Sequence, residues 1–116
     1  MPDVRRAGPG PSLLTGWGRT APSAARVAFP ADEERVAALL AQPPEGRGVV
    51  PRGLGRSYGD AAQCAGGTVV DLRQLDWVAE LDPATGELEV GGGASLQRIL
   101  EHTLPGGWFL PVTPGT

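Results

Sequence analysis

A helical pattern of hydrophobic positions opens the regular part of the chain. In the segment ADEERVAALLAQ at 31–42, acidic residues occupy the first turn, and Val36, Leu39 and Leu40 recur at the i, i+3, i+4 spacing of one helix face. The prolines at 43–44 cannot continue a helix. The pattern therefore predicts a helix that ends before these prolines.

Short apolar runs between turn residues predict the remaining elements. They are a strand at 49–50, a strand at 68–72, a hairpin of 77–81 and 87–90 around the turn 82–86, a helix that begins at Ser95 and ends before Gly106, and a last strand at 108–112. The order helix, strand, loop, strand, hairpin, helix, strand indicates an α+β fold with a small sheet and two helices.

The N-terminal residues show no periodicity. Residues 1–13 mix charge, glycine and proline, which predicts a flexible tail followed by one domain over 14–116. The segment T-G-W-G-R-T at 15–20 is too rich in glycine for a helix and predicts a loop pinned by a buried ring of Trp17. A role for that ring near a ligand stays open.

Composition and charge exclude several kinds of function. Apolar residues make up 41% of the chain and charged residues 20%, as in a soluble globular protein. A net charge of -3 without a basic run argues against nucleic acid as a partner. The ten basic residues are all arginines, so no Schiff-base lysine and no lysine-containing P-loop can form within this chain.

Single cysteine and histidine residues limit redox and metal chemistry. Cys64 has no internal disulfide partner, and with His102 alone it cannot build a metal site, so we expect a packing thiol and a solvated imidazole. We read the acids at 32–34 as a charged helix N-terminus only. The chain shows no signal peptide and no segment long enough to span a membrane, which predicts a cytoplasmic protein.

The most informative motif is R-G-L-G-R-S-Y-G-D at 52–60. Glycines permit positive φ and lack Cβ atoms, so successive backbone N–H groups can form a concave site for an anion such as a phosphate. Arg52 and Arg56 could add charge-assisted hydrogen bonds, and the hydroxyls of Ser57 and Tyr58 could complete the contacts.

The glycine-rich loop has two other interpretations. Taken alone, such a loop could be a tight surface turn. A Rossmann fingerprint fits less well, because Gly53, Gly55 and Gly59 are spaced one residue too widely and a strand follows before any helix could form.

Three segments together resemble a known family. L-T-G-W-G-R-T-A-P-S at 14–23, R-G-L-G-R-S-Y-G-D-A-A-Q at 52–63 and L-P-V-T-P-G-T at 110–116 are similar to the N-terminal part of FAD-linked oxidases of the vanillyl-alcohol-oxidase type, whose cofactor domain is of the PCMH type. The likeness covers 14–116 and is greatest to members that oxidise a lipid-linked sugar. It implies a domain that is truncated in this chain.

The resemblance implies FAD as the cofactor and assigns the residues that hold it. The implied pyrophosphate-binding residues are Gly53, Leu54, Gly55, Arg56, Ser57, Tyr58, Gly59 and Asp60, to which Arg52 adds charge, and Pro114, Gly115 and Thr116 open a second loop beside the isoalloxazine. Several relatives carry a covalently bonded histidine where this chain has Arg56. Arginine cannot form that bond, so the resemblance implies non-covalent FAD. Tyr58 is either near the substrate side of the flavin or a half-buried aromatic residue.

The implied function is the FAD-binding segment of a flavin-dependent oxidoreductase acting on a CH–OH group of a sugar or lipid-linked sugar. No catalytic base can be named, and the family's substrate domain and lysine are absent here, so we expect the chain alone to lack oxidase activity. The alternatives are a non-catalytic nucleotide- or phosphate-binding or interaction module, and a truncated product without function.

Overall fold

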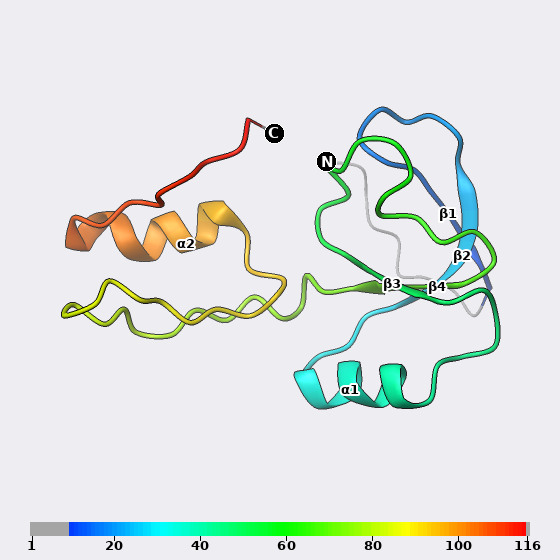
Figure 1. The fold of residues 1–116 in the computed structure, drawn as a ribbon, viewed down its shortest axis with the longest axis horizontal. Helices are drawn as coiled ribbons and strands as arrows, with labels where there is room; N and C mark the ends of the chain where they lie inside the picture. The colour runs from blue at the N-terminus through cyan, green and yellow to red at the C-terminus, as the bar shows by residue number, and fades with distance from the viewer. Residues whose placement is uncertain (1–9, 116) are drawn as a thin grey trace.

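The fold is built around a four-stranded mixed sheet. The structure is a computed structural model, and it describes residues 10–115. Its strands are β1 (Ser12–Leu14), β2 (Ser23–Ala28), β3 (Val49–Arg52) and β4 (Thr68–Asp71), in the spatial order β1-β2-β4-β3 (Figure 1). The β1 and β2 strands pair antiparallel, whereas β4 pairs parallel with both β2 and β3.

The central strand β4 supplies most of the core of the sheet. All four of its residues are buried, and Val69 is fully enclosed. A parallel strand with neighbours on both edges and cover on both faces needs such a continuous run. The buried apolar residues are Ala25, Ala62, Val69, Val70, Leu75 and Ile99. The strand predicted at 68–72 is thereby confirmed.

The first helix, α1 (Glu33–Ala41), connects β2 to β3 and lies beside the sheet (Figure 1). Asp32 caps it, because its carboxylate accepts a hydrogen bond of 2.8 Å from the backbone N–H of Arg35. The predicted helix is confirmed, although none of its residues is buried and Leu40 is 61% exposed.

The chain after β4 forms a second group of elements next to the sheet (Figure 1). The predicted hairpin follows the expected path, but only one bridge, Val78 to Val90, has regular strand pairing. The helix α2 (Leu96–Thr103) begins after Ser95, whose hydroxyl accepts from the N–H of Arg98 at 3.1 Å, and a short 3₁₀ helix, η1 (Leu104–Gly106), ends it. The second predicted helix is confirmed.

The two groups of elements are joined by a side-chain contact as well as by the chain. The indole N–H of Trp77 donates a hydrogen bond of 2.8 Å to Glu33 at the start of α1. The acidic first turn is therefore more than a charged helix end, since Asp32 caps the helix and Glu33 binds the hairpin.

Two strands of the structure, β1 and β2, were not predicted from the sequence. The β2 segment SAARVA alternates small side chains with an arginine, so it carries little of the hydrophobic contrast that marks a strand. Its partner β1 begins at Ser12, two residues before the predicted domain boundary at Leu14. Most of the predicted tail, residues 1–9, lies outside the described residues.

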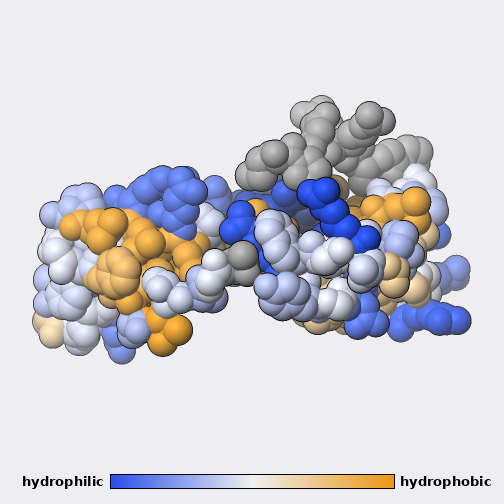
Figure 2. Space-filling model, turned by 90° about the horizontal axis from the view of Figure 1, so that it is seen from above, coloured by the Kyte–Doolittle hydropathy of each residue, from blue (hydrophilic) through white to orange (hydrophobic). Residues whose placement is uncertain are grey.

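The strand predicted at 108–112 is wrong. This segment is irregular, contains Pro111, and pairs with no strand among residues 10–115. Figure 2 shows apolar side chains gathered on the part of the molecule that carries α2 and the C-terminal segment. The exposed ones there are Leu96, Leu104, Trp108, Phe109 and Val112.

Candidate functional site

The glycine-rich loop encloses a concave pocket of about 370 Å³ at the end of β3. Its lining residues are Pro51, Arg52, Gly53, Leu54, Gly55, Arg56, Ser57, Ala61 and Ala62. Six of the nine residues expected from 52–60 to bind the cofactor therefore line one pocket. Two of the lining residues are glycines, and two more are alanines.

Within residues 10–115, no group accepts a hydrogen bond from the backbone N–H groups of this loop from Gly53 to Gly59. Gly55 and Gly59 adopt φ of 70° and 62°, the left-handed conformation that turns successive N–H groups toward one side. Unpaired amides with this backbone are suited to an anion.

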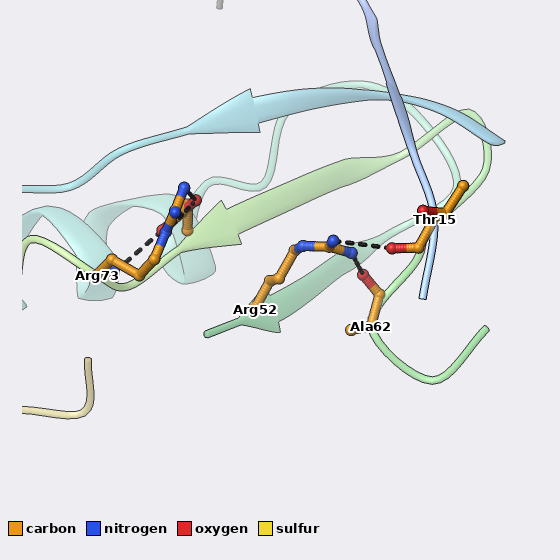
Figure 3. Close-up of polar contacts among 5 residues, drawn as sticks. Thr15, Arg52, Ala62 and Arg73 are labelled. Carbon is orange, nitrogen blue, oxygen red and sulfur yellow. Dashed lines mark hydrogen bonds and ion pairs between the residues drawn. The ribbon is translucent and has the colours of Figure 1, made fainter. Parts of the chain in front are cut away.

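Arg52 connects two backbone segments at the pocket through hydrogen bonds. Figure 3 shows its guanidinium donating to two carbonyl oxygens, that of Thr15 at 2.8 Å and that of Ala62 at 3.0 Å. Burial lowers the pKa of Arg52, an effect that Asp71 opposes and Arg73 reinforces. A Cβ on Gly55 would overlap this guanidinium, so the glycine lets the loop lie directly on the arginine.

A partly buried ion pair lies at the end of β4 (Figure 3). Asp71, the last residue of that strand, is 4% exposed and accepts from Arg73 Nη2 at 2.6 Å and from Arg73 Nε at 2.9 and 3.0 Å. The backbone N–H of Arg73 also donates to the same carboxylate at 3.1 Å. These hydrogen bonds raise the pKa of Arg73.

The Trp17 loop, defined here as residues 15–22, packs against the glycine-rich loop. The backbone N–H of Trp17 donates to the carbonyl oxygen of Ser57 at 3.0 Å. The Arg56 guanidinium lies 5.6 Å from the centre of the Trp17 ring, within the range of a cation–π contact. The prediction of a buried ring is wrong, because Trp17 is 46% exposed and backbone contacts hold its loop.

Gln63 anchors the Trp17 loop from its other side. Its amide nitrogen lies 3.0 Å from the carbonyl oxygen of Leu14, 3.1 Å from that of Ala21 and 2.9 Å from the Ser23 hydroxyl. The loop contains two non-glycine residues with positive φ, Arg19 and Ala21. Such a backbone persists only where its surroundings hold it firmly.

The structure brings some of the predicted site residues together and leaves others apart. Leu54 and Tyr58 are 47% and 72% exposed, so a half-buried Tyr58 is excluded. Asp60, Pro114 and Gly115 are exposed and do not line the pocket. Thr116 lies outside the described residues.

Other residues of this region were not predicted from the sequence. Ala61 and Ala62 line the pocket, while Thr15, Gly16 and Gln63 support it. The two glycines around Trp17 are a signal of close backbone approach, but nothing in the sequence distinguishes Gln63 from a solvated glutamine.

The remaining candidates have ordinary surroundings. His102 is exposed and bonds the carbonyl of Arg98 within α2, and Cys64 is half-buried against Gly67. In the described part of the chain, no three His, Cys, Asp or Glu side chains gather to hold a metal ion. Between residues 10 and 115, no helix has the length and apolar character required to span a bilayer.

The pocket fits the diphosphate of a dinucleotide cofactor. It offers amides that have no acceptor among the described residues, and its lining includes two cations, Arg56 and Arg52, the second of which has donors left after its two carbonyl bonds. Gly55 lies directly against Arg52, so the bend has no room for a side chain at position 55.

Comparison with known proteins points to the same chemistry. The family described as FAD binding domain matches residues 24–116. A decaprenylphosphoryl-beta-D-ribose oxidase of Mycolicibacterium smegmatis is 45% identical over 105 residues, a match that covers 89% of this chain and 23% of that protein. The chain thus spans about a quarter of the length of this curated relative.

Proposed function

This chain belongs to the FAD binding domain family, and on that premise we propose that it is the cofactor-binding part of a flavin-dependent oxidoreductase that oxidises a CH–OH group of a sugar or lipid-linked sugar. Family membership confirms FAD as the cofactor and the resemblance to FAD-linked oxidases that the motifs implied. The sugar substrate follows from the name of the relative alone.

The run of amides from Gly53 to Gly59, which have no acceptor in the described part of the chain, supports the proposal most strongly. An unpaired backbone N–H in a concave site is costly unless water or a ligand accepts from it. A diphosphate offers several charged acceptor oxygens within the span of such a bend. We therefore assign the pyrophosphate of FAD to residues 53–60, with Arg52 below it and Arg56 at the rim.

Bound FAD would supply an acceptor for a hydride leaving the alcohol carbon. The residues of this chain bind and orient the cofactor, but those lining the pocket include no carboxylate, imidazole or lysine. The proton of the substrate hydroxyl therefore has no acceptor in this lining. We infer that the chain alone turns over no alcohol.

The finer assignments belong to the same proposal. Pro114, Gly115 and Thr116 form a second cofactor contact, and Tyr58 lies toward the substrate side of the flavin, where its exposed ring is free to make contacts. FAD is held without a covalent bond, because Arg56 is not a nucleophile at ordinary pH. The cytoplasm is the expected compartment.

The proposal can be tested by titrating the chain with four ligands in a calorimeter. Recognition of a diphosphate predicts that FAD and ADP bind, and that FMN and riboflavin bind at least about tenfold more weakly. ADP binding as tightly as FAD would favour a non-redox nucleotide-binding module. Binding of none of the four ligands would contradict the proposal.

A further inference from the structure

The Trp17 loop covers one face of the glycine-rich loop at atomic contact. Gly16 is buried, and a Cβ placed on it would overlap the carbonyl oxygen of Gly59 and lie 2.8 Å from that of Ser57. The next residue, Trp17, donates its backbone N–H to the same Ser57 oxygen at 3.0 Å. Two carbonyls of the glycine-rich loop therefore face the Trp17 loop.

The direction of these carbonyls determines the direction of the following amides. In a trans peptide the C=O and the N–H of one unit point in opposite directions, and residues 10–115 contain no cis bond. The N–H groups of Tyr58 and Asp60 consequently point away from Gly16 and Trp17. Neither donates a hydrogen bond to any described residue.

The Trp17 loop is itself held in place from two sides. Arg52 binds the carbonyl of Thr15, and Gln63 binds the carbonyls of Leu14 and Ala21. These bonds support a backbone that includes the positive φ of Ala21. The orientation of the glycine-rich loop is therefore set before any ligand arrives, which reduces the ordering that binding requires.

We propose that Gly16 and the backbone of Trp17 are positioning residues for FAD, which hold the carbonyl face of the glycine-rich loop so that its amides face the cofactor. This inference rests on the proposed assignment of the FAD pyrophosphate to residues 53–60. Gly16 and Trp17 act through the orientation of peptides 57–58 and 59–60, without touching the cofactor themselves.

The chain offers a matched pair of substitutions for the test. Gly16→Ala places a methyl group against the Gly59 and Ser57 carbonyls, whereas the nearest atom to a Cβ on Gly18, in the same loop, is 4.0 Å away. We expect Gly16→Ala to raise the Kd for FAD and for ADP at least about tenfold and Gly18→Ala to change it less than about twofold. Trp17→Ala keeps the backbone N–H and should stay within about threefold of the unmodified chain.

Amide chemical shifts distinguish positioning from general damage to the fold. In ligand-free Gly16→Ala the ¹H–¹⁵N signals of Tyr58 and Asp60 should move, while those of α1 and β4 stay in place. If this variant does not fold, Gln63→Met tests the same inference. Gln63 lies outside both loops, and the substitution removes its hydrogen bonds to Leu14 and Ala21. It should also weaken FAD binding about tenfold.

Each outcome bears on a different claim. If Gly16→Ala, or Gln63→Met in its place, binds FAD within twofold of the unmodified chain, the positioning inference is overturned and the proposed function stands. If the unmodified chain and Gly18→Ala both fail to bind FAD, the proposed function fails, and the positioning inference fails with it.

Discussion

Arg52 donates a hydrogen bond of 2.8 Å to the carbonyl oxygen of Thr15, a residue 37 positions earlier in the chain. The same guanidinium donates to Ala62, so one side chain ties the start of the Trp17 loop to the end of the glycine-rich loop. The sequence suggested a charge for a phosphate at this position. The structure adds a framework role, which the arginine can combine with ligand binding because it has five donors.

Replacing Arg52 by methionine should destabilise the chain even without a cofactor. The variant leaves the carbonyls of Thr15 and Ala62 without their charged donor, so the free energy of unfolding should fall by about 2 to 3 kcal/mol. Urea denaturation followed by circular dichroism measures the change. Arg35→Met, on the exposed face of α1, is the control and should change stability by less than about 0.5 kcal/mol. Equal effects of the two variants would refute the framework role.

Alanine substitutions at Gly53 and Gly55 should distinguish an effect on stability from an effect on FAD binding. A Cβ on Gly53 meets no atom within 4 Å, so Gly53→Ala should change the free energy of unfolding by less than about 0.5 kcal/mol. The same variant should weaken FAD binding about fivefold or more, because the added methyl group occupies space beside the amides that bind the cofactor. Gly55→Ala should cost about 1 to 3 kcal/mol, since φ is 70° and the methyl group overlaps Arg52. Denaturation and FAD titration of both variants provide the comparison. Unchanged FAD affinity in Gly53→Ala would argue against close approach of the cofactor there.

The Asp71 and Arg73 pair should matter more than a comparable surface pair. Asp71→Asn removes the negative charge and one of the two oxygens that accept four hydrogen bonds from Arg73, and we expect a loss of about 2 to 3 kcal/mol, moderated by the partial exposure of the arginine. The control is Asp76→Asn, which breaks an exposed contact of 3.8 Å with Arg98 and should cost less than about 1 kcal/mol. A double-mutant cycle with Arg73→Met tests whether the two residues are coupled.

Arg56 should contribute to FAD affinity through its charge. Arg56→Gln should raise the Kd for FAD about three- to tenfold at low ionic strength, and the difference should shrink in 0.5 M salt, because an exposed cation is screened. Arg47→Gln removes an exposed arginine that does not line the pocket and should leave the Kd unchanged. Flavin fluorescence titration at two salt concentrations gives the result. A salt-independent loss would point to the stacking on Trp17 instead.

The flavin should separate completely from the denatured chain. Because Arg56 is not a nucleophile at ordinary pH, we expect all FAD to remain in the supernatant after acid precipitation. Absorbance at the flavin band in the pellet and the supernatant measures the distribution. Flavin retained in the pellet after washing would show that another residue bonds it.

Local signals in the sequence were sufficient for the helices and the central strand. The 3.6-residue periodicity marked both helices. Ser95 makes the capping bond expected of it, whereas the cap that Asp32 provides was not predicted. The apolar run at 68–71 defined β4. In β2, small side chains and Arg26 hide the alternation, and its partner residues in β4 lie 42 positions later in the chain, which no local pattern can reveal.

The sequence by itself determined the glycine-rich bend, the arginines around it and the absence of lysine, because these depend only on which residues are present and how they are spaced. Only the tertiary structure decided which of those groups are free. It engaged two donors of Arg52 with backbone carbonyls, left the amides of 53–59 without an acceptor among residues 10–115, and set the Trp17 loop against Ser57 and Gly59. Those outcomes depend on contacts between segments about 40 residues apart, which form only when the folded chain places the loop after β1 against the loop after β3.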